Sequence, residues 1–394
     1  MKKAAIILIG VLILGLIAYA SPLRGFLSGL LPLVRPAPPL PPAGEPLPFS
    51  VPEGFAAYRY ADNLPGIRVL TRAPGAAFYA SLTSEGKIVA LLDEDGDWVA
   101  EKSETVLEGL QRPHGLFVDC DENDANCTMY VAEENAVNAY RFDPATRTAS
   151  EQRTLATLPA GGGHFTRTLL PHPDGKRLLV SIGSSCNVCE ESDSRRASVQ
   201  AIDLATGAMS PFATGLRNTV FMQIHPVSGE IWGTDMGRDL LGDDTPPDEI
   251  NVLREGGWYG WPWFYGKNTV DESFGSGAPA ADPSPSMIDV PAHSAPLGIA
   301  FVPEEGWPEE YWYDALVAYH GSWNRSVPTG YKVVRFPLDA QGKPEGDPQD
   351  FLTGFTAGGS VIGRPVDVLA EPGGTVYITD DRAGAVYRVS RTSI

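Results

Sequence analysis

The amino-acid sequence predicts an all-β fold, and within that class a six-bladed β-propeller. Its 394 residues include 42 glycines and 35 prolines, which favour many turns over long helices. After residue 49 we find no sustained helical periodicity. Instead a short apolar strand, a turn and a second strand rich in Val, Ile and Tyr recur, at a spacing of roughly fifty residues. The six copies are residues 75–93, 112–134, 164–183, 217–235, 295–321 and 364–381.

Residues 1–20 predict an N-terminal hydrophobic helix ahead of this domain. Two lysines precede an uncharged apolar run, as in a secretory signal peptide, and the run is almost long enough to anchor the chain in a membrane. Either way we expect an exported, periplasmic protein, attached to the inner membrane if the helix is retained. Residues 21–48 are rich in proline and predict a semi-rigid linker, so the propeller domain is expected over residues 49–394.

Four cysteines form two close pairs in the sequence. In an exported chain they predict two disulfides, Cys120–Cys127 and Cys186–Cys189. The second pair would fit haem attachment only if a histidine followed it, and Glu190 stands there instead. Zinc would require both pairs to meet in space without histidine ligands. We therefore expect disulfides at both pairs.

The net charge of −19 argues against nucleic acid as a partner, because phosphates would be repelled. Its simplest consequence is solubility. Acidic loops can also hold calcium, which prefers carboxylate and carbonyl oxygens as ligands. Residues 237–249 form one such loop, and residues 119–124 form a second and weaker candidate.

Basic side chains recur at comparable edges of the repeats. Loops at one end of a propeller converge on its axis, so residues far apart in the sequence can share one site there. Each of these residues alone could instead cap a strand or fill the axial channel, but the five together favour a site. They are His114, His164, Arg217, His320 and Arg364.

The stretch from Gly215 to Trp263 carries a family resemblance. It contains Arg217-Asn218, then Asp248-Glu249-Ile250-Asn251, then the corner Gly-Trp-Tyr-Gly-Trp-Pro at 257–262. In this order the motifs resemble the soluble dehydrogenases for sugars that depend on pyrroloquinoline quinone (PQQ), the glucose/sorbosone dehydrogenase family. SIGSSCNVCEE at 181–191 and AYHGSWNRS at 318–326 are most similar to its sorbosone-dehydrogenase-like branch. The resemblance covers roughly residues 55–390 and implies the same six-bladed architecture.

The resemblance implies catalytic roles for His164 and Arg217 and a cofactor contact for Asn218. His164, which follows three glycines, aligns with the general base that takes a proton from the sugar hydroxyl. Arg217 would stabilise the negative charge that develops on the quinone during hydride transfer, and Asn218 would hold the cofactor edge. The alternatives are a histidine that is merely hydrogen-bonded in a loop, and an arginine paired with a carboxylate of the acidic loop.

The resemblance also implies a cofactor site and two calcium ions. The main-chain carbonyls of Gly237 and Arg238 align with ligands of the calcium ion that binds PQQ, and Glu249 and the carbonyl of Tyr259 align with a second, structural ion. Cations are needed for the carboxylates of PQQ. The remaining cofactor candidates are Arg364, Lys332 and His114.

The sequence departs from the glucose-oxidising relatives at three positions. Gly163 stands where they have Asp, Val366 where they have Arg, and His114 where they have Gln. These changes leave the base and the calcium carbonyls in place, but they weaken the inference of glucose as substrate and of strong cofactor binding.

Together these features predict an exported, PQQ- and calcium-dependent dehydrogenase of the sorbosone type. It would oxidise a sugar or sugar aldehyde by hydride transfer and pass electrons to a quinone or a cytochrome. Two alternatives remain open at this point, because fold does not fix function. One is a calcium-dependent lactonase-type propeller hydrolase, and the other is a propeller binding module without catalysis.

Overall fold

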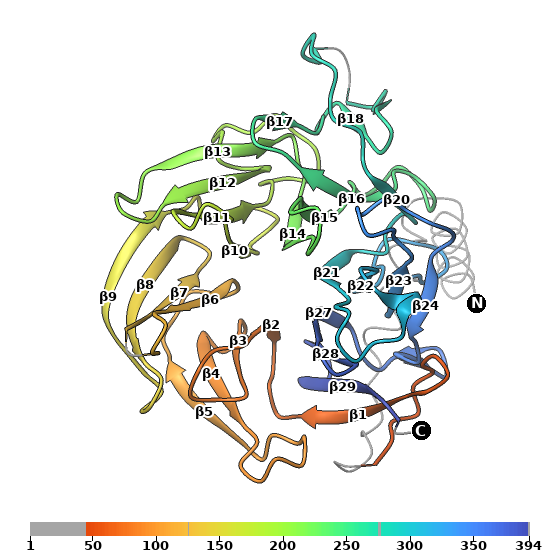
Figure 1. Cartoon of the computed structure of the whole chain (residues 1–394). Helices are drawn as coiled ribbons and strands as arrows, with labels where there is room; N and C mark the ends of the chain where they lie inside the picture. Colours follow the sequence, from red (N-terminus) through yellow and green to blue (C-terminus); the bar gives the residue numbers. More distant parts are fainter. Residues whose placement is uncertain (1–44, 125, 275–276, 393–394) are drawn as a thin grey trace, which may run out of the picture.

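Six antiparallel β-sheets surround a central axis in the computed structural model, which describes residues 45–124, 126–274 and 277–392 (Figure 1). Within each blade the strands follow one another from the axis outward. Blade 1 comprises β2 (Ile67–Thr71), β3 (Phe78–Leu82), β4 (Lys87–Leu92) and β5 (Lys102–Leu107). Blade 2 comprises β6 (Leu116–Cys120), β7 (Cys127–Ala132), β8 (Ala136–Asp143) and β9 (Thr148–Thr157). Blade 3 comprises β10 (Leu169–Pro171), β11 (Arg177–Ile182), β12 (Ser198–Asp203) and β13 (Met209–Thr214).

The second half of the chain repeats the pattern. Blade 4 comprises β14 (Thr219–Ile224), β15 (Ile231–Asp235), β16 (Asp248–Leu253) and β20 (Ile288–Val290). Blade 5 comprises β21 (Pro296–Phe301), β22 (Ala315–Tyr319), β23 (Lys332–Phe336) and β24 (Gln349–Leu352). Blade 6 comprises β27 (Pro365–Glu371), β28 (Thr375–Asp380), β29 (Ala385–Arg391) and the N-terminal strand β1 (Phe55–Ala61).

The ring is closed by the two ends of the domain. Strand β1 pairs antiparallel with β29, so the first strand in the sequence is the outermost strand of the last blade. The chain joins this blade already at Pro46, which forms a β-bridge with Tyr58, and Ser50 bridges to Thr353 of blade 5. Because closure leaves no free end in the ring of blades, the inner strands are fixed relative to one another.

The second strands of the blades are buried on both faces, which explains their almost uninterrupted apolar sequences. Every residue of β15 and of β22 (ALVAY) is buried. Trp232 of β15 is fully buried and packs edge-on against Phe301 of the neighbouring blade, with ring centroids 5.5 Å apart. Contacts of this kind join blades into one core, so the rim loops rest on a rigid base.

An insertion in blade 4 explains the long interval between the fourth and fifth repeats. The chain leaves β16, and β17 (Gly257–Trp258) then pairs in parallel with β13 on the outer edge of blade 3. It continues into the small hairpin of β18 (Phe264–Tyr265) and β19 (Thr269–Val270), which projects from the ring in Figure 1. A second small hairpin, β25 (Thr356–Ala357) with β26 (Ser360–Val361), precedes blade 6.

The six-bladed propeller is confirmed, with one correction to the repeat. Five predicted copies cover the first and second strands of a blade, but residues 75–93 cover the second and third strands, β3 and β4. The inner strand, β2, lies before that copy. The error has a physical reason: every consecutive pair of strands in a meander shows the same strand–turn–strand pattern, so the pattern alone does not fix its starting point.

Helices play a minor part in the described chain, which contains one 3-10 turn, η1 (Glu309–Tyr311). None of its helices is long and apolar enough to span a membrane. The hydrophobic helix predicted over residues 1–20 lies outside the described residues.

Candidate active site

A cavity of about 480 Å³ lies at the rim of the propeller, bordered by blades 3 to 6. Its size falls within the range of about 300–1,000 Å³ that is common for small-molecule sites. Five of the residues predicted from the sequence line it together. They are His164, Arg217, Gly237, His320 and Arg364.

These side chains lie close together because the starts of the inner strands and the ends of the second strands lie at the same end of the propeller. Arg217 and Arg364 precede the inner strands β14 and β27, while His320 follows the second strand, β22. The start of an inner strand lies opposite the end of its neighbour, as the pairing of Thr219 with Asp235 shows in blade 4. Antiparallel pairing therefore brings both kinds of position to the same end of the ring.

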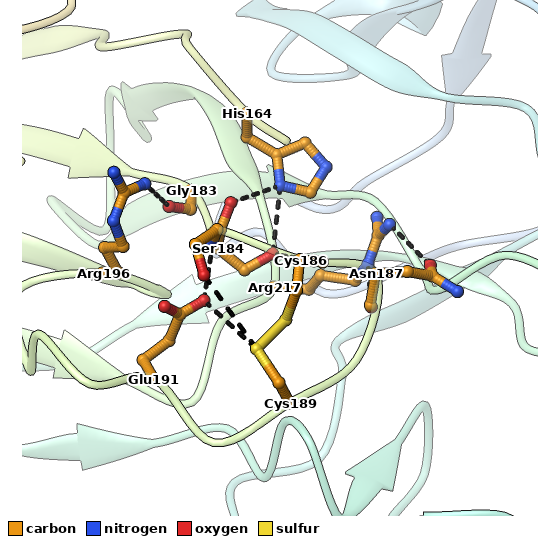
Figure 2. The surroundings of a disulfide bond; sticks show 10 residues. His164, Gly183, Ser184, Cys186, Asn187, Cys189, Glu191, Arg196 and Arg217 are labelled. Atoms are coloured by element: carbon orange, nitrogen blue, oxygen red, sulfur yellow. Dashed lines mark hydrogen bonds between the residues drawn. A yellow bond between two sulfur atoms is a disulfide. The ribbon is translucent and has the colours of Figure 1, made fainter. Parts of the chain in front are cut away.

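His164 is held as a neutral proton acceptor. Its Nδ1 lies 2.9 Å from the carbonyl oxygen of Ser184 (Figure 2), and because a carbonyl can only accept, Nδ1 carries the proton. Nε2 keeps its lone pair, and no described residue hydrogen-bonds to it. Burial, together with the positive charge of Arg217, lowers the pKa of His164 to about 4. Beneath the ring, Arg167 donates to the main-chain carbonyl of His164 at 3.1 Å and fixes its backbone.

Arg217 is buried, and its guanidinium is directed by three hydrogen bonds. Nε donates to the carbonyl of Asn187 at 2.9 Å, Nη2 to the Asn187 side-chain oxygen at 2.9 Å, and Nη1 to the carbonyl of Met236 at 3.3 Å. A guanidinium has five N–H groups, so it retains donors for a ligand. Asp239 of the acidic loop lies 3.5 Å from Nη2, so the ion pair considered from the sequence is also present.

The opposite wall carries a connected charge network. Nε2 of His320 lies 3.0 Å from the carboxylate of Asp381, which also pairs with Arg68 at 2.7 Å. Arg364 donates to the carbonyls of His320 and Gly321, at 3.1 Å each. Burial and the nearby Arg364 lower the pKa of His320 to about 4, whereas its positive neighbours hold the pKa of Asp381 well below its usual range.

The acidic loop presents main-chain oxygens at the rim. Neither the carbonyl of Gly237 nor that of Arg238 accepts a hydrogen bond from any residue that the structure describes. The N–H of Gly237 donates to buried Asp248 at 2.8 Å, and Asp248 also accepts from the N–H of Ala295 at 2.8 Å. Glycine is required at 237 because a Cβ would lie 2.6 Å from the carbonyl oxygen of Pro247. The Arg238 side chain points away, to Asp271 at 2.8 Å.

Glu249 and Tyr259 border a second, smaller cavity of about 20 Å³ next to the first, which has room for one water-sized species. Asp235 borders it too. Burial, with the neighbouring Asp235, raises the pKa of Glu249 to about 8, and burial raises that of Asp235 to about 6. Carboxylates forced together in this way are stabilised by a cation.

Three sequence candidates line neither cavity. His114 is fully buried on the axis, with Nδ1 3.3 Å from the hydroxyl of Thr168. Lys332 lies on β23, the third strand of its blade, and pairs with Asp350 at 2.5 Å. Asn218 lies behind His164, and its side-chain oxygen has no partner among the described residues. Lys332 thus stands on a third strand, away from the axis, and its assignment to the cofactor stays a prediction.

Several site residues were not found from the sequence. Ser184 and Asn187 stand in the quoted motif SIGSSCNVCEE, but their importance depends on which loops meet there. Arg68 is the second residue of the inner strand β2, and correct placement of the first repeat would have revealed it. Asp381 was signalled only by its place directly after β28.

Both predicted disulfides are present. Cys120–Cys127 joins residues that face each other on β6 and β7, whereas Cys186–Cys189 closes a loop beside the cavity (Figure 2). Cys186 itself lines the cavity. The two bonds therefore stand in very different surroundings.

A family model described as TrAA12-like matches residues 49–262 and 272–392. The chain belongs to the TrAA12-like family. An uncharacterised protein of Borreliella burgdorferi is 38% identical over 244 residues, which are 61% of this chain and 64% of that protein. A PQQ-dependent pyranose dehydrogenase of Coprinopsis cinerea is 25% identical over 368 residues, 76% of this chain and 49% of the enzyme. The chain thus spans less than two thirds of either relative.

Several solved structures share the propeller with this chain. The holo PQQ domain of Coprinopsis cinerea pyranose dehydrogenase superimposes with a TM-score of 0.72 at 22% identity, covering 90% of this chain and 98% of that one. The calcium structure of the Trichoderma reesei family AA12 enzyme gives 0.74 at 21% identity, covering 91% and 98%. The PQQ-bound aldose sugar dehydrogenase of Streptomyces coelicolor gives 0.60 at 16% identity, covering 86% and 99%. At these identities the likeness establishes the fold alone.

Proposed function

We propose that this TrAA12-like protein is a PQQ-dependent oxidoreductase that oxidises a sugar or sugar aldehyde. The observation that carries the proposal is the state of His164: a neutral imidazole with an open Nε2, held beside a buried guanidinium on the wall of the cavity. Membership of the family and the named activity of the Coprinopsis cinerea relative support the same reading.

The donor set fits PQQ and calcium. Arg217 and Arg364 supply cations for the carboxylates and quinone oxygens of the cofactor. The carbonyls of Gly237 and Arg238, which accept no hydrogen bond from the described chain, would hold a calcium ion. Glu249 and Tyr259, at the smaller cavity, would hold a second ion, and the burial of the Glu249 carboxylate next to Asp235 supports this.

The side chains divide the chemistry between them. Bound PQQ would supply the electron acceptor for a hydride from the substrate carbon. Nε2 of His164 takes the hydroxyl proton, a contribution worth roughly 10²- to 10⁴-fold in rate. Asp239, whose charge acts on His164, stabilises the resulting imidazolium. Arg217 meanwhile offers fixed positive charge where negative charge develops.

The proposed substrate is a sugar of the sorbosone type. Trp323 lines the cavity with 40% of its surface exposed, and its flat face can pack against the apolar side of a sugar ring. We further propose export to the periplasm on the strength of residues 1–20, with a quinone or a cytochrome as the final electron acceptor.

Reconstitution tests the proposal. Purified protein is supplied with PQQ and calcium, and reduction of an artificial dye is followed with a panel of aldoses and sugar aldehydes. We expect dye reduction that needs both additions, is lost with a calcium chelator and returns with calcium. Hydrolysis of lactones without PQQ would favour the hydrolase, and sugar binding without dye reduction would favour a binding module; either result contradicts the proposal.

A further inference from the structure

The loop between β11 and β12 reaches across from blade 3 to blade 4. It contains Cys186-Asn187-Val188-Cys189, and its disulfide closes it on itself (Figure 2). The hydroxyl of Ser184 donates to the carbonyl of Cys186 at 2.7 Å, and the N–H of Ser185 donates to Glu191 at 2.5 Å. The loop is thus tied at both ends, beneath the ring of His164.

Asn187 uses its whole amide to join two other segments. Its side-chain oxygen accepts from Arg217 Nη2 at 2.9 Å and from the N–H of Asp239 at 2.8 Å. Its Nδ2 donates to the carbonyl of Asp239 at 3.1 Å, and its own carbonyl accepts from Arg217 Nε at 2.9 Å. Donors and acceptors all match, so the orientation of the amide is unambiguous.

We propose that Asn187 is a positioning residue for the oxidation, and that the Cys186–Cys189 disulfide is the clasp that keeps it in place. The inference rests on the role proposed above for Arg217. Asn187 holds the guanidinium of Arg217 at the cavity wall. The same amide also fixes the backbone of the acidic loop at Asp239.

The reason for such a residue lies in the charges around it. The carboxylate of Asp239 is only 3.5 Å from Arg217 Nη2. Without the amide of Asn187, the guanidinium could turn towards that carboxylate and form a closer pair. Its positive charge would then be neutralised where the proposed reaction needs it. Asn187 avoids this because it binds Arg217 and the main chain of Asp239 simultaneously.

The disulfide is needed because no strand pairing orders the tip of the loop. Residues 183–197 contain no strand, and a loop without sheet pairing loses conformational entropy when it is fixed. Cys120–Cys127 offers the contrast, since its two residues already face each other across paired strands. Only the disulfide beside the cavity therefore supports a site residue.

Removal of each disulfide provides a matched comparison. The double variants Cys186→Ser/Cys189→Ser and Cys120→Ser/Cys127→Ser are prepared, and retention of the fold is checked by circular dichroism. We expect the first to lower kcat by roughly 10- to 100-fold, the effect of a lost hydrogen bond to a charged group, and the second to stay within twofold. Equal effects of the two on kcat would overturn the role of the clasp.

A double-mutant cycle separates positioning from general structural damage. Asn187→Ala is measured in the wild-type background and in Arg217→Met. If Asn187 acts through Arg217, Asn187→Ala lowers kcat by roughly tenfold or more in the wild-type background. In the Arg217→Met background the same substitution lowers kcat by less than about twofold. Asn187→Gln, which keeps the amide on a longer chain, should recover part of the loss. The same fold-change in both backgrounds would contradict the proposal.

Hydrogen exchange gives a readout that needs neither cofactor nor sugar. In Asn187→Ala the amide of Asp239, which loses its acceptor, should exchange at least about tenfold faster, while that of Gly237, bonded to Asp248, should not change. Unchanged exchange at Asp239 would refute the positioning role. A wild-type protein that oxidises no sugar would refute the proposed function instead, so the two failures are distinguishable.

Discussion

The two walls of the cavity each hold a histidine beside an arginine, yet the histidines differ in which ring nitrogen is engaged. Burial, with the neighbouring guanidinium, lowers the pKa of His164 and His320 alike to about 4. His164 donates through Nδ1 to a carbonyl and leaves Nε2 open, whereas His320 directs Nε2 at the carboxylate of Asp381. Residue type and burial therefore do not select a base; the partner of the ring does.

The walls also differ in charge. Arg217 faces the carboxylate of Asp239, which also lies 3.6 Å from Nδ1 of His293. The other wall combines two cations, Arg68 and Arg364, with the one carboxylate of Asp381. An excess of positive charge suits the binding of an acidic ligand, while a balanced pair beside a free imidazole suits proton transfer. We therefore assign chemistry to blades 3 and 4 and anchoring of the cofactor to blades 5 and 6.

Replacement of the two histidines tests this division most severely. His164→Ala should lower kcat by roughly 10²- to 10⁴-fold, because the proton acceptor is lost, with PQQ affinity little changed. His320→Ala, the matched variant on the other wall, should lower kcat by less than about tenfold, since its ring is occupied by Asp381. Steady-state kinetics of the reconstituted enzyme measure both. If His320→Ala lowered kcat more than His164→Ala does, the chemistry would have to be assigned to blades 5 and 6 instead.

Replacement of the two arginines should affect different quantities, kcat in one case and PQQ affinity in the other. Arg217→Met is expected to lower kcat by roughly 10²- to 10³-fold, because preorganised charge at the reacting group is removed. Arg364→Met should instead weaken PQQ binding by roughly 10- to 100-fold and spare kcat at saturating cofactor, as expected for a lost charged hydrogen bond. Absorbance titration with PQQ and turnover measurements distinguish the two. Indistinguishable profiles would remove the contrast between the walls.

The pH dependence should report the lowered pKa of His164. With a pKa of about 4, about 97% of the imidazole is neutral at pH 5.5, against about 9% for an ordinary histidine with a pKa of 6.5. Turnover should therefore persist at pH 5.5 and be lost only as the pH falls through about 4. Between pH 6.5 and 4, His164 binds more protons in the unfolded chain than in the folded chain. Lowering the pH through this window therefore destabilises the folded protein. A kcat profile that dropped near pH 6.5 would disagree.

The smallest effect is expected outside both walls. Lys332→Ala removes a side chain that pairs with Asp350 on the outer half of blade 5 and does not line the cavity. PQQ affinity and kcat should each stay within about twofold, because exposed ion pairs contribute little. A large loss of PQQ affinity in this variant would instead support Lys332 as a cofactor ligand.

The architecture could be predicted from the sequence because the repeat reflects burial. Strands such as β15 and β22 are buried throughout, and this leaves apolar runs at regular intervals. The strand at which each repeat begins was harder to predict. Since each hairpin of a meander looks alike, the first copy was placed one strand late, and Arg68 was missed with it.

The site was predictable where a residue's position along a strand determines its place in space. Arg217 and Arg364 precede inner strands and therefore reach the rim. Asn187 could not be found in this way, because its role arises from the meeting of a loop of blade 3 with a loop of blade 4. The choice between His164 and His320 as the base likewise depends on hydrogen-bond partners that only the folded chain reveals.

Our central proposal is that this cavity binds PQQ through calcium and that His164 takes the substrate proton there. A crystal structure of the protein grown with PQQ and calcium tests it most directly. We expect the cofactor in the cavity, in contact with Arg217 and Arg364, and a calcium ion at the carbonyls of Gly237 and Arg238. An empty cavity at saturating PQQ, or a cofactor bound away from His164, would contradict the account.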